Sequence, residues 1–172
     1  MTTRPPTPSA ADNASGLPER LLAIREFLAF KLADEEYGID ILRVQEIRSF
    51  EKPTRIARSP KHVLGVINLR GVIVPVIDLR VQLGMERSAV DGFTVVIVLH
   101  IGSRIVGMVV DGVSDVVTLP PEQLRAAPGF ESAIDGRHLM GLGALEERML
   151  ILLDIDQLMT SPEMGLVDPG SD

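Results

Sequence analysis

The sequence predicts a mainly β protein built from two small, closed or nearly closed barrels. Many short apolar stretches of strand length follow one another at roughly even spacing. Aromatic residues make up only 3% of the chain, so Val, Ile and Leu must fill the core, and the β-branched members of this set favour strands. One pattern of glycines, aliphatics and acids also occurs twice. Short strands in two sets favour closed barrels, because closure removes the exposed edges of small sheets.

The repeat becomes visible when the two halves of the chain are aligned. Positions between 28 and 47 recur as similar residues 69 positions later, where Glu46 falls on Asp115. Farther along the shift is 76 positions, and Gly65 falls on Gly141. Glycines and acids that recur in the same order point to a duplication rather than to a chance match of apolar residues.

The first element is a β-hairpin. Residues 27–33 alternate between two faces, both largely apolar, and the acids at 34–36 supply a polar turn into a second strand at 37–41. Residues 42–47 fit a strand and a helical turn equally well and stay unassigned.

A short helix and a buried strand are expected next. Ser59 and Pro60 resemble an N-cap and the first helical position, which predicts a helix through about Leu64. Residues 72–77 form a buried strand, and Pro75 within it predicts an edge position or a bulge because proline donates no hydrogen bond. Residues 78–83 fit a helical turn.

The second half repeats this order. Strands are expected at 94–101 and 104–110 around a Gly-Ser turn, followed by a Pro-rich crossing at 119–130 and a strand at 149–154. Asp154 to Met159 begins a C-terminal helix. Asp154 matches Asp78 across the repeat, and an acid after a strand in both halves is most simply a cap for the next helical turn.

Composition excludes several functional classes. The chain has 172 residues, no cysteine and a net charge of −7, so disulfides and thiolate chemistry are absent and nucleic acid is disfavoured as a partner. The longest apolar runs are far shorter than the roughly 20 residues of a spanning helix, so no membrane insertion is expected. Residues 1–18 are rich in Thr, Pro, Ala and Ser, which predicts a flexible leader rather than a signal peptide, and 168–172 form a tail.

Catalysis finds no support in the sequence. The three histidines share no metal-ligand spacing, and neither a nucleophile elbow nor a phosphate-binding glycine loop with lysine occurs. Four acids have the chemistry of a carboxylate pair or a divalent-metal site, but the repeat explains one of them, Asp154, as a helix cap. The histidines are His62, His100 and His138, and the acids are Asp111, Asp115, Asp154 and Asp156. We expect no enzyme activity, no cofactor and no metal site.

Three surfaces have the residue types of protein contacts. Val44, Glu46 and Ile47 offer an aliphatic patch with one acid, although Val44 and Ile47 are equally suited to the core. Arg70 is placed to bind a carboxylate with both nitrogens or to brace the two barrels. Phe130 follows Arg125 in a loop with few apolar neighbours, a pair typical of binding hot spots, but it could equally pack on its own barrel.

At these residues the sequence resembles the CheW family of bacterial chemotaxis coupling proteins. The resemblance runs from about Glu26 to Val167 within a domain spanning 19–167, and its long motifs are specific. They are EYGIDILRVQEI at 36–47, GVINLRGVIVPVIDLR at 65–80, VVDGVSDV at 109–116 and GLGAL at 141–145.

The resemblance implies two SH3-like five-stranded β-barrels packed side by side, with short helices and a C-terminal helix. The first barrel would comprise about 26–90 together with the C-terminal helix at about 154–167. The second would comprise about 91–153.

The resemblance also implies an adaptor that links methyl-accepting chemoreceptors to the histidine kinase CheA at membrane-associated receptor clusters in the cytoplasm. The alternative is a coupling protein of an array that serves an output other than chemotaxis, such as surface motility or a second messenger. Gly129 stands where close relatives tend to carry an acid, which predicts a weaker kinase contact. The implied receptor-binding positions are Val44, Glu46, Gly65 and Arg70, and the implied kinase-binding positions are Val95, Arg125 and Phe130.

Overall fold

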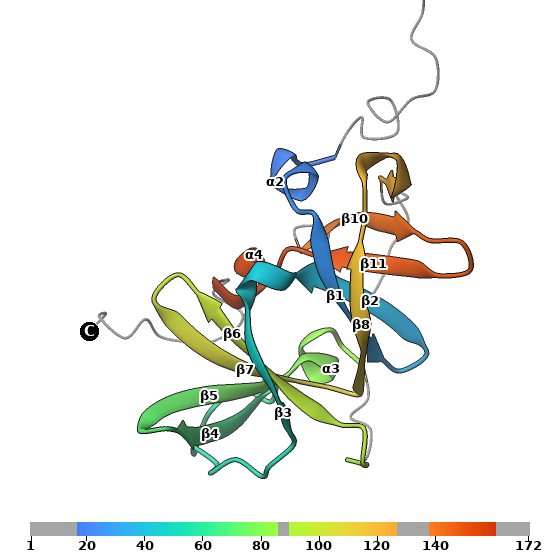
Figure 1. Ribbon diagram of the computed structural model, residues 1–172. Helices are drawn as coiled ribbons and strands as arrows, with labels where there is room; N and C mark the ends of the chain where they lie inside the picture. The colour runs from blue at the N-terminus through green and yellow to red at the C-terminus, as the bar shows by residue number, and fades with distance from the viewer. Residues whose placement is uncertain (1–16, 86–89, 127–137, 161–172) are drawn as a thin grey trace, which may run out of the picture.

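The chain forms two β-sheets side by side, joined by short helices (Figure 1). The computed structural model describes residues 17–85, 90–126 and 138–160. The six-stranded sheet has the order β8 (Gly112–Thr118), β1 (Glu26–Leu32), β2 (Glu35–Asp40), β11 (Met149–Leu153), β10 (Leu139–Ala144) and β9 (Leu124–Arg125). The five-stranded sheet has the order β3 (Val44–Ser49), β6 (Val95–Ile101), β7 (Arg104–Val110), β5 (Val72–Asp78) and β4 (Val63–Leu69). The helical elements are α2 (Glu19–Leu22), α3 (Leu79–Gln82), α4 (Ile155–Thr160) and the 3-10 turns η1 (Ile41–Arg43) and η2 (Pro121–Gln123). The fold is therefore mainly β, as expected, with the two-residue strand β9 as an addition to the expected five.

The two halves of the chain exchange strands, which differs from the expected division into 26–90 and 91–153. Strand β3 of the first half pairs with β6 of the second, and β8 of the second half pairs with β1 of the first. Parallel pairings of β2 with β11 and of β5 with β7 complete both sheets from both halves. The exchange has a physical reason, because half of a chain this short buries too little apolar surface to be stable alone.

The five-stranded sheet curls until its two edge strands meet. Strands β3 and β4 stand at opposite ends of the strand order, yet the segment after β3 bridges β4. The N–H of Thr54 donates to the carbonyl oxygen of Val66 at 2.8 Å, and the N–H of Val66 donates back at 2.9 Å. These bonds close the sheet into a small barrel.

Among the described residues, three hydrophobic clusters form the core: one belongs to each sheet, and the largest lies between the two sheets. Strand β1 serves two clusters, because Leu28 and Phe30 face the shared cluster while Phe27 and Ala29 face the interior of the six-stranded sheet. Strand β6 does the same in the other sheet. Both faces of these central strands are buried, which explains their nearly continuous apolar sequence.

The duplication extends to irregularities in the strands. A register shift leaves Gln45 as the extra residue in β3, and another leaves Ser114, 69 positions later, as the extra residue in β8. In the hairpins, Leu64 and Met140 are the extra residues, and these lie 76 positions apart. Bulges recurring at equivalent positions support a common origin of the two halves.

The helix predicted from Ser59 and Pro60 does not form, and that prediction is wrong. The Ser59 hydroxyl donates to the carbonyl oxygen of Ile56 at 2.9 Å instead of capping a helix, and the N–H of Val63 closes a turn onto Pro60 at 3.0 Å. Strand β4 begins at Val63. Pairing of Val63 with Ile77 of β5 prevails over the local helix signal.

Pro75 lies in an interior strand, because β5 has neighbours on both sides. The residue opposite Pro75 is Val66, whose own N–H and carbonyl group bond to Thr54. The missing N–H of proline therefore removes no bond to β4. The bulge in this hairpin lies in the partner strand, at Leu64.

The two expected caps are present. The carboxylate of Asp78 accepts the N–H of Arg80 at the start of α3 at 3.0 Å, and that of Asp154 accepts the N–H of Gln157 in α4 at 3.1 Å. The unassigned residues 42–47 divide between η1 and β3. The part of the C-terminal helix expected beyond Thr160 lies outside the described residues.

A buried arginine ties the two sheets together. The side chain of Arg80 is 2% exposed, and its Nε and Nη2 donate to the two carboxylate oxygens of Asp78, both at 2.9 Å. Its Nη1 donates at 2.7 Å to Asp111 in the link between β7 and β8, and Asp111 also accepts the N–H of Ala33 in the turn after β1. The hydrogen bonds to Asp78, followed by those to Asp111, raise the pKa of Arg80.

Candidate functional site

The acid and the arginine expected to contact a receptor form an ion pair across the closed edge of the five-stranded sheet. Glu46 lies on β3 and Arg70 in the turn after β4, and Arg70 Nη2 lies 3.2 Å from both carboxylate oxygens of Glu46. Arg48 Nη1 approaches the same carboxylate at 3.5 Å. Arg70 is exposed, and its left-handed backbone (φ 51°) lies in the turn between β4 and β5. Val44 lies two residues before Glu46 and packs partly against the shared core.

Gly65 plays a different part from the other three positions. It is buried with φ of 146°, and a Cβ built on it would lie 2.0 Å from the carbonyl oxygen of Thr54. The residue therefore permits the close backbone approach that closes the barrel. A Cβ built on its repeat partner Gly141 would similarly lie 2.9 Å from the carbonyl oxygen of Arg125.

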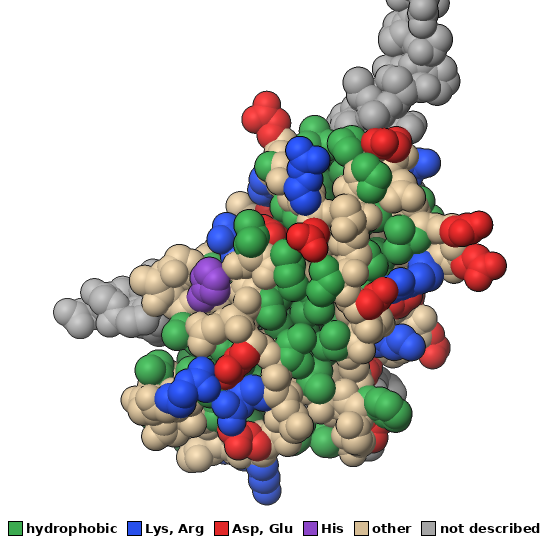
Figure 2. Space-filling model, viewed as in Figure 1, with side chains coloured by type: hydrophobic (Ala, Val, Ile, Leu, Met, Phe, Trp, Pro, Cys, Tyr) green, Lys and Arg blue, Asp and Glu red, His purple; other side chains and the backbone are tan. Residues whose placement is uncertain are grey.

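An apolar strip lies on the molecular face between β3 and β8. Figure 2 shows hydrophobic side chains gathered there, with charged side chains on both sides. Strand β3 contributes the partly buried Val44 and the exposed Ile47, and β8 contributes the repeat partners Val113 and Val116. Leu42 in η1 is 73% exposed, which a core side chain would not be. Contiguous exposed apolar side chains with a charged rim are typical of protein-binding surfaces.

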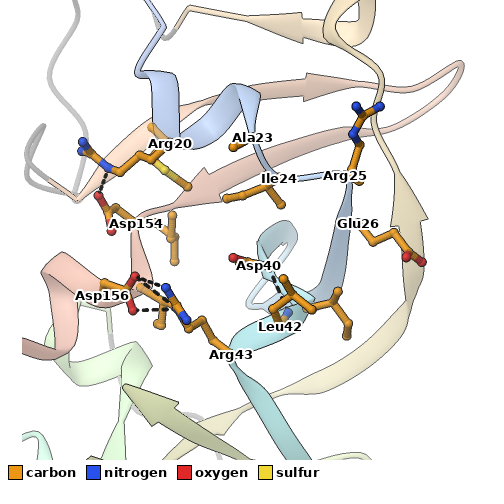
Figure 3. Close-up of a pocket in the computed structure, with 14 residues that line it drawn as sticks. Arg20, Ala23, Ile24, Arg25, Glu26, Asp40, Leu42, Arg43, Asp154 and Asp156 are labelled. Carbon is orange, nitrogen blue, oxygen red and sulfur yellow. Dashed lines mark hydrogen bonds and ion pairs between the residues drawn. The ribbon is translucent and has the colours of Figure 1, made fainter. Parts of the chain in front are cut away.

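A groove opens where α2, η1 and α4 meet (Figure 3). It has a volume of about 480 Å3, and Leu42 lies on its wall. Two ion pairs frame it: Arg20 with Asp154, and Arg43 with Asp156, where Arg43 Nε lies 3.0 Å from Oδ1. Sequence reasoning included Ile47 in a candidate patch but did not identify Leu42 or Val116 as surface residues. For Val116 the available signal was its pairing with Ile47 across the repeat.

The six-stranded sheet carries a counterpart of the Glu46–Arg70 pair. Arg148, in the turn before β11, donates at 2.8 Å to Glu36 on β2 and at 2.8 Å to Asp115, the repeat partner of Glu46. The hydrogen bonds from Arg148 lower the pKa of both carboxyl groups. In each half of the repeat, an arginine from a hairpin turn thus pairs with the equivalent acid. Arg70 pairs with Glu46 on β3, and Arg148 pairs with Asp115 on β8.

The positions expected to contact the kinase are not brought together. Val95 begins β6 in the five-stranded sheet, whereas Arg125 lies on β9 at the edge of the six-stranded sheet. Arg125 Nη1 donates to the carbonyl oxygens of Glu122 at 2.7 Å and Leu124 at 2.9 Å. Phe130 lies outside the described residues. Phe93 lies two residues before Val95 and is 79% exposed. The two residues line one pocket, and sequence reasoning did not identify Phe93.

The backbones of two histidines make equivalent hydrogen bonds in the two halves of the repeat. His62 and His138 are separated by the 76-residue shift, and their carbonyl oxygens accept the N–H groups of Asp78 and Asp154 at 2.7 and 2.8 Å. Within residues 17–85, 90–126 and 138–160, no group of three or more His, Asp or Glu side chains is arranged to hold a metal ion. No helix in the described part of the chain has the length and apolar character to cross a membrane.

Comparison with known proteins places the chain in a family. The model of the CheW-like domain matches residues 26–163. "Chemotaxis protein CheW" of Klebsiella aerogenes is 59% identical over 144 residues, which cover 84% of this chain and 87% of that protein. "Protein FrzA" of Myxococcus xanthus is 29% identical, over 87% of this chain and 98% of that protein.

A solved structure has the same fold. The crystal structure of the scaffolding protein TtCheW from Thermoanaerobacter tengcongensis superposes with a TM-score of 0.73 at 29% identity, covering 80% of this chain and 93% of that one. The two-sheet β architecture of this chain agrees with the fold of that scaffolding protein. The chain belongs to the CheW-like family of scaffolding and adaptor proteins, which are not enzymes.

Proposed function

We propose that this chain couples transmembrane chemoreceptors to the histidine kinase CheA and thereby helps receptors to control kinase activity. The similarity to a chemotaxis protein over most of the chain supports this function. The observation that carries it is the surface of β3, where the Glu46–Arg70 ion pair borders an apolar strip. Such a surface binds a partner without any chemistry of its own.

The receptor contact is assigned to Val44, Glu46 and Arg70, with Gly65 supporting the surface from within. Glu46 and Arg70 present one carboxylate and one exposed guanidinium. A charged group of the partner can replace either member of this ion pair. Val44 and Ile47 supply the apolar component. Charge on the rim selects the partner, while apolar side chains contribute most of the affinity.

The kinase contact is assigned to Val95, Arg125 and Phe130. Val95 and Arg125 lie in different sheets, which suits two separate contacts better than one patch. An adaptor with two kinase contacts can link kinases into an extended assembly, in which each weak contact is reinforced by the others.

Control of the kinase requires different affinities for its active and inactive states. An adaptor that binds both states equally shifts no equilibrium, however tight the binding. The adaptor is therefore expected to work within membrane-associated receptor clusters in the cytoplasm, where receptor and kinase are held together.

A second candidate is a coupling protein of an array that serves an output other than chemotaxis. The observation that favours it is the similarity to FrzA over 87% of this chain, since that relative is not described as a chemotaxis protein. The receptor and kinase partners encoded beside the gene for this chain would separate the two candidates.

The substitution Glu46→Lys tests the receptor surface. It places a cation against Arg70 and Arg48, so we expect receptor affinity to fall by about tenfold or more while the free energy of unfolding changes by less than ~1 kcal/mol. Glu147→Lys makes the same change of charge at an exposed turn and is the control. Affinity is measured with receptor-containing membranes, and unfolding with urea. Unchanged affinity in a folded Glu46→Lys variant would contradict the assignment.

A further inference from the structure

A basic segment interrupts the acidic surface of this chain. The chain has 24 acids and 17 Lys and Arg residues, yet residues 52–61 contain four cations and no acid. All four side chains are exposed: Lys52, Arg55, Arg58 and Lys61. We call this segment the basic loop. It joins β3 to β4 and lies at the end of the five-stranded sheet (Figure 1).

The basic loop has a defined shape. Thr54 is hydrogen-bonded to Val66 of β4 in both directions, and the Ser59 hydroxyl bonds to the carbonyl oxygen of Ile56. Arg58 has a left-handed backbone (φ 64°), a conformation that residues other than glycine adopt only at a cost in free energy. Cations on such a frame lose less freedom when they bind a ligand than cations on an unconstrained chain.

Grooves beside the loop combine positive charge with apolar walls. One, of about 640 Å3, is lined by all four cations together with Phe50, Pro53, Val63 and Leu64. The other, of about 720 Å3, runs between Ile56 and Arg58 on the loop and the exposed side chains of Val72 and Ile73 on β5. Neither groove includes Val44, Glu46, Val95 or Arg125, and the second includes Gly65 at its wall.

We propose that the basic loop is a docking site for a protein segment rich in Asp and Glu with interspersed apolar side chains. Guanidinium groups pair with carboxylates through two hydrogen bonds, and the apolar walls accept aliphatic side chains between the acids. A protein segment fits better than a nucleic acid, because the net charge of −7 opposes a long polyanion and the loop itself presents no aromatic ring for base stacking. This site goes beyond the receptor and kinase contacts and does not depend on them.

The test uses the full chain and synthetic probes. The main probe is a fluorescein-labelled peptide of about 20 residues with Glu at the polar positions and Leu at helical spacing, and its partner has Gln in place of Glu. Single-stranded DNA of matched length and phosphatidylglycerol vesicles are the competing anions. The double variant Arg55→Glu/Arg58→Glu reverses the loop. Arg25→Glu/Lys31→Glu makes the same change of net charge at exposed positions on and next to β1 and is the control.

We expect the parent chain to bind the Glu peptide, with affinity falling as salt rises, and to bind the Gln peptide at least about tenfold more weakly. The loop variant should lose about tenfold in affinity for the Glu peptide, and the control variant less than about twofold. Failure of the parent to bind the Glu peptide, equal losses in both variants, or tighter binding of DNA or vesicles would each overturn the proposal. Far-ultraviolet circular dichroism confirms that both variants are folded.

Discussion

At the scale of single residues, Gly65 shows how a position implied in receptor binding can act through the fold. Its side of β4 faces the backbone of Thr54 without room for a side chain, and its φ of 146° strains any other residue. Replacement therefore alters the shape of the neighbouring surface rather than removing a direct contact.

We expect Gly65→Ala to destabilise the chain by about 2–4 kcal/mol, through backbone strain and the clash with Thr54. Gly92→Ala is the matched control, because nothing lies within 4 Å of a Cβ at that position and its φ is not strained. Urea unfolding of both variants measures the difference. Equal stability of the two variants would contradict the structural role of Gly65.

Arg80 and Arg70 each pair with acids but differ in burial, at 2% and 63% exposure. Arg80→Ala leaves Asp78 buried without its partner, so we expect a loss of about 3–5 kcal/mol. Arg70→Ala breaks an exposed pair and should cost less than ~1 kcal/mol. Thermal unfolding of the two variants at neutral pH checks this order, and a reversed order would refute the distinction.

Sequence reasoning recognised that Arg70 could bind a carboxylate, and the structure identifies that carboxylate as Glu46. The exposure of Leu42 and Phe93 could not be predicted, because a lone apolar residue has the same sequence signal on the surface as in the core. Which side of a strand faces solvent depends on the other sheet, and no local pattern specifies that.

At the scale of elements, the two hairpins each place an arginine against the third strand of a repeat. Arg148 joins β2, β8 and the turn before β11 in the six-stranded sheet, and Arg70 joins the turn after β4 to β3 in the other. The Glu46–Arg70 pair connects the two edges of its sheet, whereas Arg148 connects the edge strand β8 with the interior strand β2.

The pairing of Arg148 makes part of the stability depend on pH. Arg148 lowers the pKa of Glu36 below its ordinary 4.5 and that of Asp115 below its ordinary 3.8. A lowered folded-state pKa adds stability above the unfolded value, and this gain disappears as pH falls through the folded value. We expect Arg148→Gln to be less stable than the parent by about 1 kcal/mol at pH 7, because solvent screens these partly exposed groups, and the gap to close below about pH 4. Urea unfolding across this pH range measures the gap, and a constant gap would contradict the ion pair as its source.

Most strands were predictable because alternation and turn residues are local signals. The hairpins at 26–40 and 95–110 follow from apolar alternation around polar or glycine turns. The false helix near Ser59 shows the limit of such signals, since a cap-like Ser-Pro pair also fits a turn before β4. Segment 42–49 needed the structure, because a 3-10 turn followed by a bulged strand has no single period.

At the scale of the whole molecule, strand exchange makes one folding unit of two repeats. Each sheet takes strands from both halves, and the largest core cluster lies between the sheets. The sequence contains no local signal for this exchange, because a third strand has the same composition whether it pairs within its own half or with the other. The parallel pairings of β2 with β11 and β5 with β7 are equally invisible in the sequence.

This architecture predicts that neither half folds alone. Fragments 1–90 and 91–172 should each give the circular dichroism spectrum of an unfolded chain, and mixing them should restore the β spectrum of the intact chain as each supplies strands that the other lacks. In the control, each fragment is mixed separately with an unrelated acidic protein. A folded fragment 1–90 would show that its strands can form a barrel without the second half.

Coupling itself is tested most directly by co-sedimenting the purified chain with receptor-containing membranes, with and without CheA, while ATP turnover by the kinase is followed. The account predicts that the chain is captured only when receptors are present and that capture changes kinase turnover. It also predicts that Glu46→Lys lowers capture while Glu147→Lys does not. Absence of capture together with unchanged turnover would contradict the proposed coupling function.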